Sequence, residues 1–561
     1  MSKAATIYFL ILISQISLLA QPQVRDIKEG TAMISGRVTL KDEPARGVLV
    51  ALQQLQPNMP PNQNPGLRQK TDDEGRYKFT GIAGGSYIIS VLAPGFITPS
   101  ENIYPRQGKP INISEGENVE NLDFELKRGG VITGRVTDSN GKPMVDENIA
   151  LVGLDPSGRP AYGNIGMNPY MYRTDDRGVY RLYGVPAGRY VLSVGIATEE
   201  GSAMYSQNRT YYPRTYYPDV TDRAKAKIIE LSEGEEVTGV DISVGEGKKT
   251  YDVFGRVVDA DNNQPVAGVE LTYGAYQRDG RNIMWGGFMG ERSNAQGEFQ
   301  LQGILPGKYG VVAASSDRSE YYSDPTPLEI ADSDISGVEV RVRRGGSISG
   351  VAVIEGTNDP ALYARLSQLM LGVYTRSDQL NMPGRGGVRI NPAGGFRITG
   401  LRPAKTEFSL YYSAGGRGGF SLLRVERDGI PQPEGIDLRP GEQLSNVRLV
   451  IGYGNGIMRG QLKIIGAEIP QGASFFIFAQ RIGGVRTSGF NAQVDTRGQF
   501  LIEGLMAGAY EVRVTYFVRS ANPANDSLLR SKFAQFKQTV NVAGSGETPV
   551  TLTIDVTQKE N

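Results

Sequence analysis

Two residue types that carry out much of enzyme chemistry are absent from this chain. Among its 561 residues there is no cysteine and no histidine. The missing thiol rules out disulfides, thiolate nucleophiles and sulfur metal ligands. The missing imidazole rules out a Ser/His/Asp triad, a Cys/His dyad and an HExxH-type zinc site. Most familiar hydrolase mechanisms are therefore excluded.

One acidic segment has part of the spacing of a calcium-binding loop. In DADNNQPVAGVE, residues 259–270, the first, third, fifth and twelfth positions are Asp259, Asp261, Asn263 and Glu270. The sixth position of such a loop needs glycine for its sharp turn, and here it is Gln264. The segment also aligns with DSNGKPMV, residues 138–145, which indicates a turn. We therefore favour a hairpin turn and expect no metal or cofactor.

Two pairs of adjacent carboxylates resemble the acid and base of a glycosidase. They are Asp72 with Asp73, and Asp175 with Asp176. Neighbouring residues on a strand face opposite sides, so such a pair does not meet across a substrate. We interpret both pairs as hairpin residues and expect no catalytic residue.

Aromatic side chains are the remaining candidates for a ligand-binding site. RTYYPRTYYPDV, residues 209–220, contains Tyr211 and Tyr212 in an insertion, whereas its second half aligns with other copies of a repeat and is expected to be structural. YQRDGRNIMWGGFMGERSN, residues 276–294, reads as an inserted loop with Trp285 and Phe288, whose rings could stack on a sugar. For Trp285 we favour the alternative that it covers the edge of a core.

A pattern of two glycines around an alternating strand recurs five times. The first glycines are Gly75, Gly178, Gly297, Gly394 and Gly498, and the second glycines, six residues later, are Gly81, Gly184, Gly303, Gly400 and Gly504. An aromatic residue always lies two positions after the first glycine. A tyrosine opens the next strand in four copies, at Tyr87, Tyr190, Tyr309 and Tyr510. Period two between glycine turns indicates a strand, a turn and a second strand.

Each copy also begins with an opening strand, such as ISGRV or ITGRV, and ends with a closing strand. Joints such as KRGG and RRGG are too short for flexible linkers, so we expect an end-to-end rod. Units of about 100 residues with some seven short strands fit a β-sandwich. The predicted organisation is a signal peptide at 1–20 and five all-β units at 30–128, 129–248, 249–343, 344–454 (divergent) and 455–561. We expect no large helix, and favour strand for DPALYARLSQLML, residues 359–371.

The combination of xGRV, DSNGKPM, DxxGxY and GxYxVxV resembles the carboxypeptidase regulatory-like domains. These are transthyretin-like (prealbumin-like) sandwiches, related in fold to Cna B-type repeats and to the carbohydrate-binding-like fold. The resemblance covers about residue 30 to 556 and implies a non-catalytic exported protein, since the family serves as accessory, spacer or binding modules.

The sequence argues against two properties of the related families. Cna B-type repeats can carry a Lys to Asn isopeptide bond whose lysine lies on the opening strand. No lysine follows the opening-strand glycines here, where the residues are Arg37, Arg135, Arg256, Val351 and Gln461. Starch-binding modules stack sugars on paired tryptophans, and this chain has one tryptophan.

The N-terminus and the net charge bear on location and partners. MSKAATIYFLILISQISLLA has one lysine before a short apolar run, which is typical of a signal peptide. We therefore expect an exported protein, periplasmic, surface-associated or secreted, that is not inserted in a membrane when mature. Lysine and arginine total 60, as do aspartate and glutamate, so no nucleic acid partner is expected.

The leading hypothesis is an exported binding or scaffold protein that binds a glycan or another cell-surface polymer. The main alternative is a purely structural spacer or adhesin-like rod in a cell-envelope assembly, with a surface protein as partner. A glycoside hydrolase that uses carboxylates alone is a remote alternative, because repeats of one small module offer no separate catalytic domain.

Overall fold

A computed structural model describes residues 29–55, 66–98, 108–155, 157–160, 172–196, 210–276, 283–313, 320–376, 385–412, 419–466, 473–485, 489–517 and 523–557. The predicted signal peptide lies outside these residues. Among the described helices, none combines the length and the apolar character that crossing a membrane requires. The predicted all-β fold, a tandem array of five β-sandwiches, is confirmed.

Five separate hydrophobic cores succeed one another along the chain. They span residues 32–126, 132–244, 253–342, 348–451 and 458–556. Each core is enclosed by two sheets, one of which contains the opening strand. We call these the opening sheet and the second sheet of the first to the fifth unit. The third unit shows the arrangement most clearly, with sheet orders β24-β21-β28-β26 and β23-β22-β25-β27. Its described strands number eight, one more than the seven expected.

The opening sheets contain the following strands. In the first and second units they are β1 (Glu29–Leu40), β2 (Glu43–Pro44), β5 (Arg76–Ile82), β7 (Phe96–Ile97), β9 (Asn118–Val119), β10 (Phe124–Arg128), β11 (Gly130–Thr137), β13 (Val179–Val185), β18 (Glu236–Val237) and β19 (Ile242–Ser243). In the other units they are β21 (Tyr251–Asp259), β24 (Glu298–Ile304), β26 (Tyr321–Ser323), β28 (Ile335–Arg344), β29 (Gly346–Ile354), β32 (Gly395–Leu401), β34 (Phe420–Arg427), β35 (Ile430–Pro431), β37 (Gln443–Tyr453), β38 (Asn455–Ile465), β41 (Gln499–Leu505) and β44 (Ser545–Asp555). Opening and closing strands pair in parallel, as β21 does with β28.

The second sheets consist largely of antiparallel hairpins. In the first and second units they contain β3 (Leu49–Gln54), β4 (Leu67–Lys70), β6 (Gly85–Leu92), β8 (Lys109–Ile113), β12 (Ile149–Leu154), β14 (Gly188–Val194), β16 (Thr215–Tyr216) and β17 (Ile229–Leu231). In the other units they contain β22 (Glu270–Tyr276), β23 (Ile283–Arg292), β25 (Gly307–Ala313), β27 (Thr326–Ile330), β30 (Leu369–Arg376), β31 (Arg385–Arg389), β33 (Lys405–Tyr412), β36 (Ile436–Asp437), β39 (Ser474–Arg481), β40 (Gly489–Gln493), β42 (Gly508–Phe517) and β43 (Gln538–Val542). A separate ladder joins β15 (Thr210–Tyr211) to β20 (Lys248–Lys249).

Helical segments correct two sequence-based expectations. The strand favoured over residues 359–371 begins only at Leu369, because α2 (Pro360–Ala364) and the 3-10 helix η4 (Arg365–Gln368) precede it. Asp359 caps α2 by accepting a hydrogen bond from the N–H of Ala361 at 2.9 Å. A second 3-10 helix is η3 (Arg223–Lys225). The expectation of no large helix is also wrong, since α3 spans Pro523–Gln535.

The repeated tyrosine has one structural role in all four copies that contain it. Its ring is buried, and its hydroxyl donates a hydrogen bond to the carbonyl four residues earlier in the chain. The pairs are Tyr87 with Ala83 (2.9 Å), Tyr190 with Pro186 (2.6 Å), Tyr309 with Leu305 (2.8 Å) and Tyr510 with Met506 (3.2 Å). This bond ties the turn between the two hairpin strands to the core. In the fourth unit the position is Thr406, which is fully buried.

Three of the joints consist of a single glycine between two strands. Gly129 separates β10 from β11, Gly345 separates β28 from β29, and Gly454 separates β37 from β38. A Cβ at Gly454 would lie 2.3 Å from the backbone of Leu505, and one at Gly129 would lie 2.4 Å from Gly184. The absence of a side chain therefore lets each joint lie directly on the next unit.

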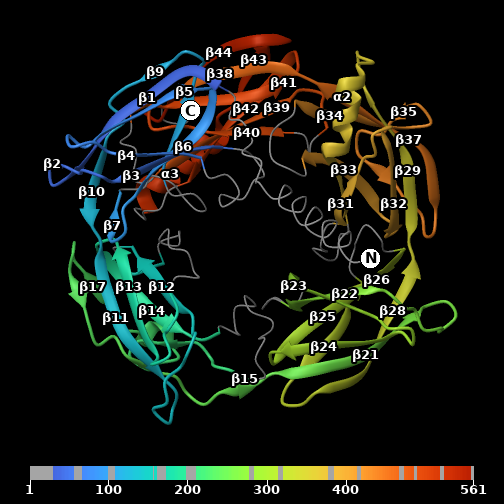
Figure 1. The fold of residues 1–561 in the computed structure, drawn as a ribbon. Coiled ribbons are helices and arrows are strands. Elements are labelled where there is room, and N and C mark those ends of the chain that lie inside the picture. The colour runs from blue at the N-terminus through green and yellow to red at the C-terminus, as the bar shows by residue number, and fades with distance from the viewer. Residues whose placement is uncertain are drawn as a thin grey trace, which may run out of the picture.

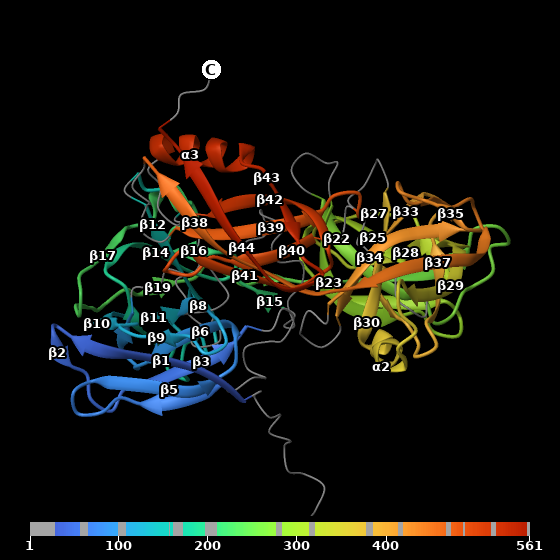
Figure 2. The same ribbon diagram turned by 90° about the horizontal axis from the view of Figure 1, so that it is seen from above.

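The five units form a ring (Figure 1). They follow each other end to end, as the short joints predict, but the array is not the extended rod that we expected. Repetition of similar, tightly packed joints bends the array in one sense, as in solenoid proteins. Strands β28 and β29 follow the outer rim of the ring in Figure 1. Seen at right angles in Figure 2, the first unit lies below the fifth, so the two ends of the array overlap.

Candidate functional site

The acidic segments form turns, as predicted. Oδ1 of Asp72 accepts hydrogen bonds from the backbone N–H groups of Glu74 (3.1 Å) and Arg76 (2.7 Å). Asp73 points elsewhere and pairs with Arg46 at 2.8 Å. These contacts show that Asp72 organises the hairpin turn and does not face its neighbour.

The calcium-like segment is also a turn. The N–H of Asp259 donates to the carbonyl of Gln264 at 2.8 Å, and Oδ1 of Asp259 accepts from the N–H of Asp261 at 2.9 Å. Oδ1 of Asn263 is occupied by a hydrogen bond from Arg341 at 2.8 Å. Within the described part of the chain, no three acidic side chains gather as ligands of a metal ion.

Tyr211, the first of the two inserted tyrosines, ends β15, which lies at the joint between the second and third units (Figure 1). Tyr211 pairs with Lys248 in the β15–β20 ladder, and its side chain is only 4% exposed. Burial, together with the nearby hydroxyl of Tyr251 in the third unit, raises the pKa of Tyr211. Tyr212 packs against the core of the second unit. Tyr211 therefore offers a ligand almost no surface and acts as packing in the joint.

Trp285 does not lie in the inserted loop that we expected. It is part of β23, where it pairs with Gly274 of β22 at the edge of the second sheet. The indole covers Gly274, where an added Cβ would lie 3.0 Å from the ring. Trp285 is partly exposed, so the edge-covering interpretation and a role in binding are both compatible with its position. The side chain of Phe288 lies outside the described residues.

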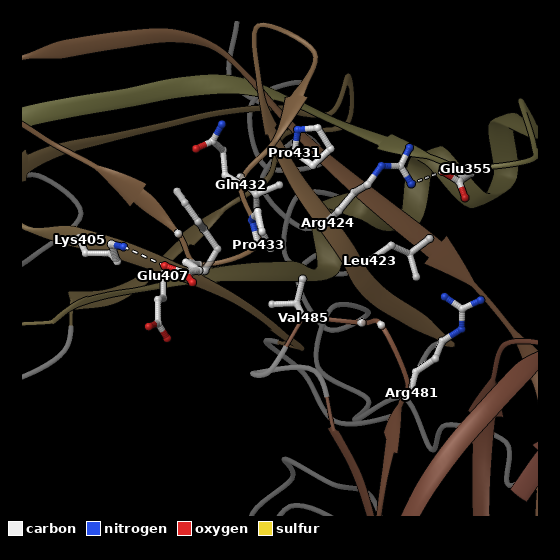
Figure 3. Close-up of a pocket in the computed structure, with 16 residues that line it drawn as sticks. Glu355, Lys405, Glu407, Leu423, Arg424, Pro431, Gln432, Pro433, Arg481 and Val485 are labelled. Carbon is white, nitrogen blue, oxygen red and sulfur yellow. Dashed lines mark hydrogen bonds and ion pairs between the residues drawn. The ribbon is translucent and has the colours of Figure 1, made fainter. Parts of the chain in front are cut away.

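A pocket of about 490 Å³ lies between the fourth and fifth units (Figure 3). The fourth unit contributes residues of β33, β34 and the loop after β35, and the fifth contributes the turn after β39. Figure 3 shows Lys405 on one side and Arg481 on the other, with Leu423 and Val485 between them. Sequence reasoning missed this site because its residues are far apart in the chain.

The charges that line this pocket are balanced. Its cations are Lys405, Arg424 and Arg481, and its carboxylates are Glu355, Glu407 and Glu434. Most of these are committed to partners: Arg424 donates to Glu355 and, at 2.7 Å, to Glu426, whereas Lys405 lies 3.3 Å from Glu434. Such a neutral, internally paired surface has no strong preference for a charged ligand, but a molecule bound in it would contact both units.

An extensive polar contact between distant segments joins the first unit to the fifth. Asn112 of β8 is 3% exposed and Asp495 is 6% exposed. The N–H of Asn112 donates to Oδ2 of Asp495 at 3.1 Å, and its side-chain amide donates to the carbonyls of Gln493 (3.2 Å) and Gln499 (2.9 Å). Within the first unit, Ser86 donates to Oδ1 of Asn112 at 2.6 Å, so the side-chain amide is held in place while it bonds to the fifth unit.

Arg497 adds charge to this contact. Its guanidinium donates to the carbonyl of Asn112 at 2.6 Å and to Glu117 of the first unit at 2.7 Å. Burial alone would raise the pKa of Glu117, but hydrogen bonds from Ser114 and Arg497 outweigh it and lower that pKa. We call these four residues, Asn112, Glu117, Asp495 and Arg497, the closure cluster.

Two further residues show how closely the end units approach. Nη2 of Arg459 in β38 donates to the carbonyl of Ile113 at 3.3 Å. Burial, followed by the charges of Glu503 in the fifth unit and Glu115 in the first, raises the pKa of Tyr87 to about 12. The contact therefore extends from β8 to the opening sheet of the fifth unit. The sequence does not single out the residues of this contact, because the same turn motif recurs in all five units.

Comparison with known proteins identifies no family. No family model matches the sequence, and no curated protein matches it. Solved structures with partial similarity include the Bacillus anthracis TIE protein (16% identity over 56% of this chain and 51% of that one, TM-score 0.15). A Streptococcal ancillary pilin is 12% identical over 56% of this chain and 99% of that one, with a TM-score of 0.26. BcpA, the major pilin subunit of Bacillus cereus, is 11% identical over 55% of this chain and 99% of that one, with a TM-score of 0.14. The chain thus spans about half the length of the first of these proteins, and these scores establish no shared arrangement of the units.

Proposed function

We propose that this protein is an exported, non-catalytic scaffold of the cell envelope whose five sandwiches form a closed ring. The observation that supports the proposal is the closure cluster, because a buried polar contact between the first and last units fixes the shape of the whole array. The carboxypeptidase regulatory-like domains that the sequence resembles act as accessory and spacer modules, which fits a role carried by shape. The proposal includes the unit boundaries and the signal peptide predicted above.

Electron microscopy of the purified mature protein tests this proposal directly. Negatively stained single particles should be closed rings of five masses. Extended, variably bent chains of five masses in neutral buffer would contradict it. An enzyme would be indicated by any turnover that disappears when a single aspartate or glutamate is replaced.

Binding of a glycan is the second candidate function. It is favoured by the partial exposure of Trp285 on an edge strand, where an indole face could stack on a sugar ring. Tyr212 and Phe288 stay predicted contributors, whereas the burial of Tyr211 argues against direct contact with a ligand. Because Trp285 is the only tryptophan, its fluorescence reports on this site alone. Glycans found on an array should shift that emission, and hits that leave it unchanged would place binding elsewhere.

A further inference from the structure

The contact that closes the ring joins two different surfaces. The first unit contributes β8 and Glu117, and the fifth contributes the turn of residues 495–499 together with Arg459. A contact between unlike surfaces is heterologous, so the same pair of surfaces can join separate molecules head to tail. Either the chain's own fifth unit or the fifth unit of another copy can occupy β8, and the two compete for it.

The surface on the first unit is suited to pairing. In the described second sheet, the strand order β4-β3-β6-β8 leaves β8 at the edge. The N–H of Asn112 donates across the closure contact to Asp495, and its carbonyl accepts from Arg497. Exposed strand edges readily pair with other chains, and natural proteins cover them. In this protein, the fifth unit covers the edge strand β8.

We propose that the closure cluster also joins one copy of this chain to another, so that opened rings assemble head to tail. This inference rests on the proposed closed ring and names the partner of the same contact, a second copy. In an isolated chain the intramolecular contact is favoured, because tethering gives the two surfaces an effective concentration in about the millimolar range. At high local concentration, or when rings open before they meet, the intermolecular contact competes.

Charge reversal separates the two modes of contact. In Glu117→Arg and in Arg497→Glu, like charges face each other within every chain, so each variant alone should be open. In an equimolar mixture, the arginine introduced at position 117 meets the glutamate introduced at position 497 of the other chain. The native Glu117 and Arg497 also meet between chains. Full-length mixtures should therefore form particles of at least twice the chain mass in light scattering, whereas each variant alone should stay monomeric.

The double variant and an internal ion pair provide controls. Glu117→Arg/Arg497→Glu should close again as a monomer, more weakly than the wild type, because the ion pair is restored within one chain but the hydrogen bond to the Asn112 carbonyl is not. Glu236→Arg mixed with Arg181→Glu, at a pair 3.1 Å apart inside the second unit, should give no complexes. A double variant that recloses while the closure mixtures stay monomeric would overturn the inference and leave the closed ring intact.

A measurement on the unmodified protein covers the case in which the variants fail to fold. Wild-type chains opened at acid pH and returned to neutral pH should form multimers whose fraction rises with chain concentration. Monomers alone at every concentration would overturn the inference. Extended monomers in neutral buffer would instead contradict the closed ring itself, so the two failures are distinguishable.

Discussion

The backbone N–H of Asn112 in the first unit donates a hydrogen bond to Asp495 in the fifth, although 383 residues separate them. Asp495 also accepts hydrogen bonds from the N–H groups of Arg497 (2.9 Å) and Gln499 (2.8 Å) in its own turn. One carboxylate thus serves both the local hairpin and the closure of the ring. The two roles can be separated, because the second unit contains the same turn without the distant partner.

Replacement of Asp495 should open the ring. In Asp495→Ala the buried N–H of Asn112 loses its acceptor, which costs about 1–3 kcal/mol, and Arg497 loses a charged neighbour. We expect a larger radius of gyration in small-angle X-ray scattering. Asp175→Ala is the matched control, since Asp175 accepts from the N–H groups of Arg177 and Val179 in the equivalent turn. Equal expansion of both variants would mean that the turn, not the closure contact, holds the shape.

Acid should open the ring through Glu117. Its pKa is lower in the closed ring than in an exposed glutamate, so closure releases a proton. The stabilisation is complete above the ordinary glutamate pKa of about 4.3 and is lost as the pH falls through the lower value of the closed ring. The sedimentation coefficient should therefore decrease in acid before the cores unfold.

Glu117→Gln identifies the group responsible for this transition. The amide keeps the size of the side chain but carries no charge for Arg497, so closure should be weaker at neutral pH and less sensitive to acid. A variant whose sedimentation coefficient falls over the same pH range, by the same amount, would show that other carboxylates control opening.

The tyrosine hydroxyls should contribute similarly in each unit that has one. Tyr190→Phe removes the 2.6 Å hydrogen bond to the carbonyl of Pro186 and leaves the ring in the core. We expect the second unit to lose about 1 kcal/mol of unfolding free energy, measured by hydrogen exchange of its core amides. Tyr183→Phe, at a residue of the same unit that is 40% exposed, is the control. An equal effect at both positions would contradict the role assigned to the hydroxyl.

The repeats were predictable from sequence because they depend on local chemistry. Glycine turns, alternating apolar residues and the recurrent tyrosine each act within a few neighbouring residues, and Asp72 and Asp259 organise turns as expected. The helix α3 was not predicted, because tertiary contacts stabilise it. Its residues Leu529 and Phe533 pack on the fifth core.

The ring was not predictable, since its shape is set by contacts between units. Asn112 looks like any strand residue, and Arg497 has a counterpart, Arg177, at the same position of the equivalent turn in the second unit. The pocket between the fourth and fifth units was not predicted either, because it is also formed by residues of two units. Trp285 was misplaced because its glycine-rich surroundings resemble a loop, yet they form an edge strand that pairs with β22.

A methyl group at a joint glycine should disturb the docking of two units. In Gly454→Ala the new Cβ would lie 2.3 Å from the backbone of Leu505, which cannot move away as a flexible side chain could. We expect a loss of about 1–3 kcal/mol and an altered angle between the fourth and fifth units. Gly245→Ala, where a Cβ would meet nothing within 4 Å, is the matched control. Crystal structures or scattering curves that are unchanged for Gly454→Ala would refute this account of the joints.

Tyr211 should stabilise the joint between the second and third units. This joint is longer than a single glycine, and the β15–β20 ladder braces it, with the buried ring of Tyr211 near Tyr251. Tyr211→Ala should therefore cost about 3 kcal/mol locally, and residues 245–250 should become sensitive to proteases. Tyr183→Ala, at a side chain 40% exposed in the same unit, should leave the cleavage rate unchanged. If Tyr211→Ala instead abolishes binding of a ligand without faster cleavage, the residue belongs to a binding site and not to the joint.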